Sequence, residues 1–148
     1  MLDALTFQRI AHALHGRGNK LAARLLTRVS RHLFACHLPA EVELGAGCEL
    51  GYGGIGVIVH PQARIGRDVL LSPGVVIGGR SGLPGAPVIG NGVKIGAGAK
   101  ILGPITLGDG VHVGANAVVI RDVPAGAVVA GIPAQPIEKK LKVVEGAG

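Results

Sequence analysis

The stretch VIGNGVKIGAGAKILGPITLGDGVHVGANAVVIRDVP, residues 88–124, repeats with a period of six residues. Each hexapeptide has an aliphatic residue in one fixed place, and the residue four places later is aliphatic or alanine. The aliphatic column consists of Ile89, Ile95, Ile101, Leu107, Val113 and Val119. Self-similarity at a short fixed period indicates stacked repeats that bury their apolar residues against one another. We therefore expect short strands that turn this column inward, with the glycines that follow it permitting the turns.

The same register continues toward the N-terminus, with two breaks. It includes Ile77, Leu71, Ile65 and Val59, and then Leu50, Leu44 and Leu38. Nine residues instead of six separate Leu50 from Val59, so GYGGIG at residues 51–56 is expected to bulge or loop. Residues 80–86 are rich in Gly and Pro, a poor composition for a coil wall, and are expected to form an external loop. A loop on a rigid scaffold is a usual place for function.

Composition restricts the class of protein. The chain has 148 residues, which is typical of one domain, and it contains 26 glycines but only 2% aromatic residues. Glycine does not recur every third residue, which excludes collagen, and a hydrophobic content of 48% excludes a disordered chain. A nucleic-acid interface usually combines basic with aromatic side chains, so we expect no nucleic-acid binding.

Residues 2–34 have apolar residues at helical spacing with basic residues between them. This pattern predicts two amphipathic helices with a break at residues 16–19. Most of the net charge of +6 lies in this part, because six basic residues and one acidic residue precede residue 35. A basic helix face is most often solvated, and contact with a membrane surface or an acidic partner is the alternative. The predicted organisation is a helical segment at 1–36, a β-helix domain at 37–137 and a basic tail at 138–148.

Two features predict a cytoplasmic protein. Asp3 lies where a secretory signal carries positive charge, and no stretch has the length and hydrophobicity of a membrane span. Cys36 and Cys48 form no CxxC pair, so we expect small reduced residues and no disulfide framework.

The segments IGAGAKILG at residues 95–103 and AGIPA at residues 130–134 are more specific than the repeat itself. With them, the region from Leu38 to Ile137 resembles the catalytic domain of the serine acetyltransferases, a branch of the hexapeptide-repeat acyltransferases. The resemblance implies a mainly β fold, a left-handed parallel β-helix, here preceded by a short helical segment. It also implies acetyl-CoA as donor substrate, bound in a groove between neighbouring β-helices of a homotrimer. The implied activity is an O-acetyltransferase acting on a small hydroxyl acceptor, L-serine or a related compound.

The resemblance also implies which residues contact acetyl-CoA. The expected contacts are Gly79, Ala97 and Ala115 along the pantetheine arm, Arg80 and Lys100 at the groove edge, and Pro133 near the adenine. The alternative for the small residues is that corners of the repeat need glycine or alanine in any case. The tail lysines at 139, 140 and 142 could meet the CoA phosphates or remain solvated.

The sequence departs from that family at the reacting centre. The Asp and His pair of the serine acetyltransferases corresponds to Gly51 and Tyr52, and their second catalytic Asp corresponds to His37. The Arg and His of the external loop correspond to Gly85 and Ala86, so groups expected to hold the carboxylate of an amino acid are missing. The alternative acceptor is therefore a sugar hydroxyl, in polysaccharide or glycoconjugate biosynthesis.

Acetyl transfer to a hydroxyl group needs a base, because the hydroxyl attacks a thioester only as its proton is removed. Histidine suits this role near neutral pH. His60 follows the predicted strand at residues 57–59, just after the first register break, and is our candidate for the base. The alternative is an outward-facing surface histidine. His37 could orient the acceptor or begin the first coil, and Tyr52 could donate a hydrogen bond to the acceptor or pack over the groove.

Two other classes of protein use a similar fold. A zinc hydratase of the γ-carbonic anhydrase type needs three histidine ligands, and the repeat contains only His60 and His112, so no metal is expected. A non-catalytic assembly module, in which the basic helices bind a partner protein, is the other open alternative.

Overall fold

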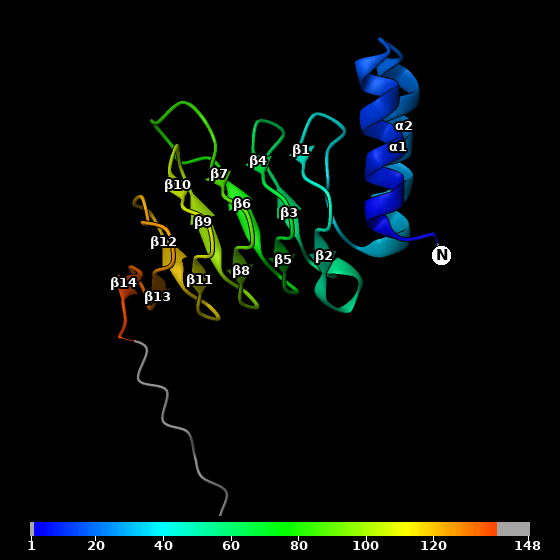
Figure 1. Cartoon of the computed structure of the whole chain (residues 1–148). Coiled ribbons are helices and arrows are strands. Elements are labelled where there is room, and N and C mark those ends of the chain that lie inside the picture. The colour runs from blue at the N-terminus through cyan, green and yellow to red at the C-terminus, as the bar shows by residue number, and fades with distance from the viewer. Residues whose placement is uncertain (1, 139–148) are drawn as a thin grey trace, which may run out of the picture.

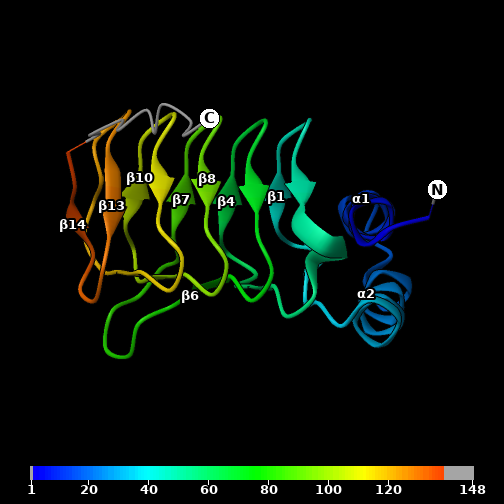
Figure 2. The same ribbon diagram turned by 90° about the horizontal axis from the view of Figure 1, so that it is seen from below.

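A computed structural model of the protein describes residues 2–138. Two helices, α1 (Ala4–Gly16) and α2 (Lys20–Phe34), precede a row of short strands that coil around one axis. Figure 1 shows the helices across one end of this row, and Figure 2 shows the stacked coils from below. The predicted pair of helices and the mainly β fold are therefore confirmed.

The strands are two or three residues long. They are β1 (Glu43–Leu44), β2 (Glu49–Leu50), β3 (Ile58–Val59), β4 (Arg64–Ile65), β5 (Leu70–Leu71), β6 (Val76–Gly78), β7 (Val88–Ile89), β8 (Lys94–Ile95), β9 (Lys100–Leu102), β10 (Thr106–Leu107), β11 (His112–Val113), β12 (Val118–Val119), β13 (Val128–Ala130) and β14 (Gln135–Pro136).

From β1 to β12, successive strands belong in turn to three different sheets, so three strands complete one coil. The sheets have the orders β1-β4-β7-β10, β14-β13-β11-β8-β5-β2 and β12-β9-β6-β3. All pairs are parallel except β13 with β14. The fold is a β-solenoid, as the period of six predicts.

The pairing register places aliphatic side chains directly above one another. Val59 pairs with Ile77, Ile77 with Ile101, and Ile101 with Val119. Ile77 and Ile101 are 0% exposed, and the rest of the column read from the sequence is buried except for Leu44 and Leu50 in the first coil, which are partly buried. Burial of each such side chain stabilises the fold by about 1.5–3 kcal/mol. The core is therefore a continuous aliphatic ladder.

The glycine that follows the column residue has a different role from the one expected. Gly96 does not have positive φ, and a Cβ on it would lie 2.6 Å from the backbone nitrogen of Ala115 in the next coil. Positive φ occurs instead in the turns, for example at Gly92 and Gly98. The glycine after the column thus lets two coils approach closely, and other glycines make the turns.

Local signals define both helices. The Asp3 side chain accepts a hydrogen bond from the Thr6 backbone N–H at 2.8 Å, and Asn19 caps α2 in the same way. Gly18 has a φ of 82° in the turn between the helices, and Ala35 ends α2 in the left-handed conformation. The predicted break at residues 16–19 is confirmed.

Helix α1 is fastened to the first coil by side chains. Gln8 Nε2 donates to the Val42 carbonyl at 3.0 Å, and His12 Nδ1 donates to the Ala40 carbonyl at 2.7 Å. Gln8 is buried, so its hydrogen bond satisfies a group that would otherwise be costly to bury.

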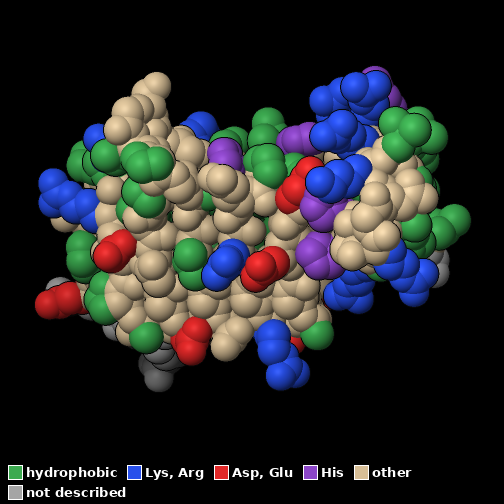
Figure 3. Space-filling model, turned by 90° about the horizontal axis from the view of Figure 1, so that it is seen from above, with side chains coloured by type: hydrophobic (Ala, Val, Ile, Leu, Met, Phe, Trp, Pro, Cys, Tyr) green, Lys and Arg blue, Asp and Glu red, His purple; other side chains and the backbone are tan. Residues whose placement is uncertain are grey.

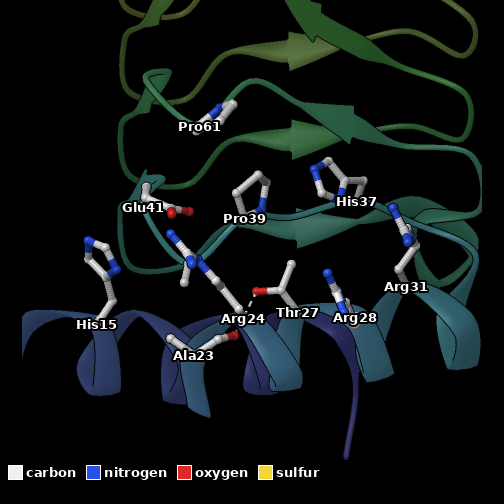
Figure 4. Close-up of a pocket in the computed structure, with 11 residues that line it drawn as sticks. His15, Ala23, Arg24, Thr27, Arg28, Arg31, His37, Pro39, Glu41 and Pro61 are labelled. Carbon is white, nitrogen blue, oxygen red and sulfur yellow. Dashed lines mark hydrogen bonds between the residues drawn. The ribbon is translucent and has the colours of Figure 1, made fainter. Parts of the chain in front are cut away.

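Helix α2 is oriented differently from a typical surface helix. Four of its apolar residues are exposed, Leu21 at 81%, Leu25 at 62%, Val29 at 40% and Leu33 at 63%, whereas the residues it buries are Ala23 and Ser30. The arginines of α2 lie instead on the side that borders the solenoid (Figure 4). The basic face is therefore not simply a solvated face turned away from the protein.

Candidate functional site

The first register break forms a short 3₁₀ turn, η1 (Gly51–Gly54), between β2 and β3. Tyr52 lies in this turn with a φ of 50° and is 88% exposed. No side-chain hydrogen bond of Tyr52 is found within residues 2–138. The expected bulge is confirmed, and it presents the tyrosine side chain to solvent.

His60 follows β3 and is half-buried, one residue beyond the fully buried Val59. A Cβ on Gly79 would lie 3.7 Å from His60 Nε2 and 3.8 Å from the Gly85 carbonyl oxygen. His60 therefore faces the base of the loop formed by residues 80–86, which projects from the coils as predicted (Figure 2).

The other ring nitrogen of His60 has a backbone partner. Nδ1 accepts a hydrogen bond from the Gln62 N–H at 3.1 Å. In a neutral histidine this arrangement favours the tautomer with its proton on Nε2, the atom nearest Gly79. The imidazole thus presents an N–H donor toward the loop in this form.

His37 begins the solenoid beside β3. Its backbone N–H donates to Val57 at 2.8 Å, and its carbonyl accepts from Val59 at 3.0 Å. The Nδ1 atom is buried and has no hydrogen-bond partner among the described residues. Burial lowers the pKa of His37, and the nearby charge of Arg31 lowers it further, although Glu41 acts in the opposite direction. His37 is therefore neutral near pH 7.

A hollow of about 320 Å³ separates α2 from the first coils. Figure 4 shows the side chains around it, which include His15, Arg24, Arg28, Arg31, His37, Glu41 and Pro61. A second hollow of about 400 Å³ shares Glu41 and Pro61 with the first and extends to Gly85 and Ala86 in the external loop. The two hollows meet at Glu41 and Pro61, and we call them together the α2 groove. His60 lines neither hollow, but it directly precedes Pro61 in the chain.

The structure places the predicted CoA contacts around a single face, made by β3, β6, β9 and β12. Gly79 and Arg80 lie where β6 ends, and Lys100 begins β9. Ala97 lies before β9, and Ala115 lies before β12. The catalytic candidates border the same face, since η1 precedes β3, His60 follows it, and His37 pairs with its first residue.

Two of the residues predicted to contact CoA, Lys100 and Arg80, have defined partners in the structure. The Lys100 ammonium donates to the Gly98 carbonyl at 2.9 Å, and Arg80 forms a bridge with Leu83 across the external loop. The turn that contains Pro133 is held against β12, because Val118 N–H donates to the Gly131 carbonyl and Val118 accepts from Ala134. The tail lysines at positions 139, 140 and 142 lie outside the described residues.

Sequence reasoning did not find the arginines of the α2 groove. Arg24, Arg28 and Arg31 recur at intervals of four and three, which indicates one helix face. That signal gives no orientation, and only the structure reveals that this face borders the solenoid.

The cysteines are not suited to covalent catalysis. Cys36 and Cys48 are both free and buried, and burial raises the pKa of each thiol. The Cys48 thiol donates to the Gly66 carbonyl at 3.2 Å. No cluster of three or more His, Cys, Asp or Glu side chains that could hold a metal ion is found within the described part of the chain.

Known proteins with related sequences match this architecture. Residues 86–121 match the bacterial transferase hexapeptide family (six repeats). Over 140 residues the chain is 39% identical to the serine acetyltransferase of Helicobacter pylori, an alignment that covers 93% of this chain and 81% of that protein. The chain belongs to the serine acetyltransferase family. The resemblance inferred from the repeat and the AGIPA segment is confirmed.

Solved structures of the family have the same fold. The soybean serine acetyltransferase apoenzyme superposes with a TM-score of 0.86 at 36% identity, covering 90% of this chain and 56% of that one. The Brucella abortus serine acetyltransferase in complex with coenzyme A has a TM-score of 0.85 at 37% identity, covering 90% and 54%. This chain thus spans about half the length of these two serine acetyltransferases.

Proposed function

We propose that this protein transfers the acetyl group of acetyl-CoA to the hydroxyl group of a small acceptor, L-serine or a related compound. Related structures support both substrates, because the Brucella abortus enzyme was solved with coenzyme A and a soybean enzyme with serine. Within this chain, the observation that carries the proposal is the position of His60 Nε2 beside Gly79, at the edge of the face that carries the residues predicted to contact CoA.

The transfer is direct in this proposal. The acceptor oxygen forms a bond to the acetyl carbonyl carbon, the thioester C–S bond breaks, and the hydroxyl proton passes through a base to the CoA thiolate. Backbone N–H groups near the external loop stabilise the negative charge on the carbonyl oxygen in the tetrahedral intermediate. Both thiols are buried, so an acetylated cysteine is not part of the mechanism.

His60 is the proposed general base. For this role Nε2 must have a free lone pair and Nδ1 must carry the proton, so the hydrogen bond from Gln62 opens during turnover. That same hydrogen bond favours a second role, in which Nε2–H donates to the carbonyl oxygen of the thioester. His37 and Tyr52 serve in acceptor binding at the other end of β3. The two roles of His60 predict different substitution effects, described in the Discussion.

A sugar hydroxyl is the second candidate acceptor. Gly85 and Ala86 line the wider hollow of the α2 groove, and their small side chains leave about 400 Å³ beside Pro61. This space suits an acceptor larger than serine. A sugar O-acetyltransferase of polysaccharide or glycoconjugate biosynthesis is the corresponding function.

The proposed assembly is a homotrimer in the cytoplasm. The β3-β6-β9-β12 face has Ile58, Val76 and Val118 in one outward column, with Lys100 between the last two. Ile58 is 48% exposed, and such a flat, partly apolar face is suited to contact with another copy. No helix within residues 2–138 is long and apolar enough to cross a membrane. Light scattering at micromolar concentration tests the trimer, and a monomer or a hexamer would contradict it.

An acceptor screen tests the function directly. Purified protein is incubated with acetyl-CoA and either L-serine, simple sugars or nucleotide sugars, and release of the CoA thiol is measured. Turnover with serine supports the amino-acid acceptor, and turnover only with sugars supports the alternative. Absence of acetyl-CoA binding by calorimetry contradicts both and favours a non-catalytic assembly module.

A further inference from the structure

Three arginines form a continuous basic surface on α2, which we call the arginine face: Arg24, Arg28 and Arg31. Their spacing places them on one side of the helix, and Figure 4 shows all three side chains directed toward the first coils. Lysine, arginine and histidine side chains gather at this helical end of the molecule in Figure 3. Basic charge is therefore concentrated at the helical end of the molecule, and three of its arginines line the α2 groove.

The arginine face forms no ion pair within residues 2–138. Across residues 2–138 the structure contains one ion pair, between Arg64 and Glu43 in the first coils. Glu41 is the sole acidic side chain that lines the narrower hollow, and it forms no ion pair with the arginines. Like charges four residues apart on a helix repel each other. All three side chains are exposed, so this repulsion is weak in the free protein, and a bound anion would offset it.

The groove has the size and chemistry of a site for a small acidic molecule. Arginine guanidinium groups bind phosphate and carboxylate oxygens through paired N–H donors, and three in one hollow can surround such a group. Thr27 and His15 add polar atoms to the same wall. The narrower hollow borders the wider one at Glu41 and Pro61, and Pro61 directly follows His60 in the chain. A molecule held by the arginine face can therefore extend toward the proposed reacting centre.

The external loop does not supply this charge. Among residues 80–86 only Arg80 is ionisable, and its backbone is engaged in a bridge with Leu83. Gly85 and Ala86, which line the groove, have no charged atoms. The other charged side chains of the wider hollow are Glu41, Glu43 and Arg64, and Arg64 is paired with Glu43. The arginines of the groove that form no ion pair therefore all lie on α2.

We propose that the arginine face binds an anionic group, phosphate or carboxylate, on the acetyl acceptor, so that the acceptor hydroxyl lies toward His60. This inference rests on the proposed acetyltransferase function and narrows the acceptor to small molecules that carry a phosphate or carboxylate group. Neutral sugars are excluded as preferred acceptors, whereas sugar phosphates, uronic acids and serine all meet the requirement.

Direct binding tests the site without turnover. Inorganic phosphate and, separately, acetate are titrated by calorimetry into the full chain saturated with CoA, which occupies any phosphate site of the donor. The parent is compared with the double variant Arg28→Gln/Arg31→Gln, because glutamine keeps helix propensity while removing charge. Lys20→Gln is the matched control, since it removes one charge from the first turn of α2, outside the groove. We expect phosphate affinity to fall about 10- to 100-fold in the double variant and to stay within twofold in the control.

Kinetics with paired acceptors then distinguish the two anions. Glucose is compared with glucose 6-phosphate and glucuronate, and serine with serinamide, in the thiol-release assay. The anionic member of at least one pair is expected to have the lower KM, by about tenfold or more, and the double variant is expected to remove that advantage. Which pair shows the effect identifies phosphate or carboxylate as the bound group.

The possible outcomes distinguish a failure of the anion site from a failure of the proposed acetyltransferase function. If CoA binds and acceptors turn over but the double variant binds phosphate and acetate as the parent does, the anion site is wrong and the acetyltransferase function stands. If CoA does not bind but the arginines still bind phosphate, the function fails and the anion site stands. Equal KM values for neutral and anionic acceptors would also overturn the inference.

Discussion

The solenoid and helix α2 both carry regular aliphatic columns, yet they use them in opposite ways. Ile101 in the solenoid is 0% exposed, whereas Leu25 on α2 is 62% exposed. The inward place of each coil is enclosed by three sheets and by the coils before and after it. Helix α2 turns Ala23 and Ser30 inward and directs its arginines to the groove. A hydrophobic period thus predicts the type of element in both regions but predicts burial only in the solenoid.

The same comparison explains where the site lies. The regular coils provide a rigid face, and each feature of the candidate site occurs where regularity ends. The turn η1, the start of the solenoid at His37 and the loop at residues 80–86 all interrupt the repeat. Rigid elements that position irregular loops are the usual basis of a precise site.

The largest expected effect comes from the irregular region. Replacing His60 by Ala lowers kcat by about 10²- to 10⁴-fold if the residue is the general base, while the fold survives because the side chain projects outward from the ladder. His60→Gln sharpens the test, because glutamine can donate a hydrogen bond but cannot accept the proton. Thiol-release kinetics with both variants, and circular dichroism for the fold, are the measurements.

The two substitutions of His60 separate its roles. Loss of activity in both variants supports the role of general base. Activity retained in His60→Gln supports the donor role favoured by the Gln62 hydrogen bond. A parent-like kcat in His60→Ala removes this residue from the mechanism.

The next effect compares the two aliphatic columns directly. Ile101→Ala removes a side chain from the centre of the ladder and is expected to lower the free energy of unfolding by about 2–5 kcal/mol. Leu25→Ala removes an exposed side chain and is expected to change it by less than about 0.5 kcal/mol. Urea unfolding of both variants measures the difference. A large loss with Leu25→Ala would mean that the exposed column is covered in solution.

A smaller effect separates the two kinds of glycine. Gly96→Ala forces a Cβ against the backbone of the next coil and is expected to cost about 3 kcal/mol. Gly92→Ala has open space around the new methyl group but a φ of 65°, which costs about 1–2 kcal/mol. Thermal unfolding ranks the two variants. The opposite order would contradict the coil spacing described here.

The smallest effect concerns pH. The pKa of His37 is lowered in the folded protein, so below its ordinary value near 6.5 the unfolded chain binds more protons than the folded one. The contribution of neutral His37 to the free energy of unfolding is therefore complete above that pH and is lost as the pH falls below it. Urea midpoints at pH 7.5 and 5.5 are expected to differ more in the parent than in His37→Asn. His32→Asn, an exposed control on α2, is expected to show the same difference between the two midpoints as the parent. An equal difference in the parent and in His37→Asn would contradict this prediction.

The sequence predicts the regular part of this protein well because its signal is local and repeated. The column that includes Ile77 and Ile101 and the bulge at residues 51–56 follow from counting by six, and the external loop follows from its Gly and Pro content. The position of His60 one step beyond a buried strand residue follows in the same way. These features need no knowledge of contacts between distant segments.

The α2 groove could not be predicted in this way. The orientation of the helices depends on hydrogen bonds from Gln8 to Val42 and from His12 to Ala40, which join residues 34 and 28 positions apart. No periodicity in α2 encodes those contacts. The spacing of the arginines indicates a basic face, but the groove exists only because α1 fixes α2 against the first coils.

The position of the CoA sulfur tests the proposed reacting centre most directly. A crystal structure of the protein with coenzyme A would locate that atom relative to His60 and Gly79. We expect the sulfur on the β3-β6-β9-β12 face, with His60 Nε2 within hydrogen-bonding reach of it, directly or through one water molecule. Coenzyme A bound along another face of the solenoid, with its sulfur remote from His60, would contradict the proposed centre.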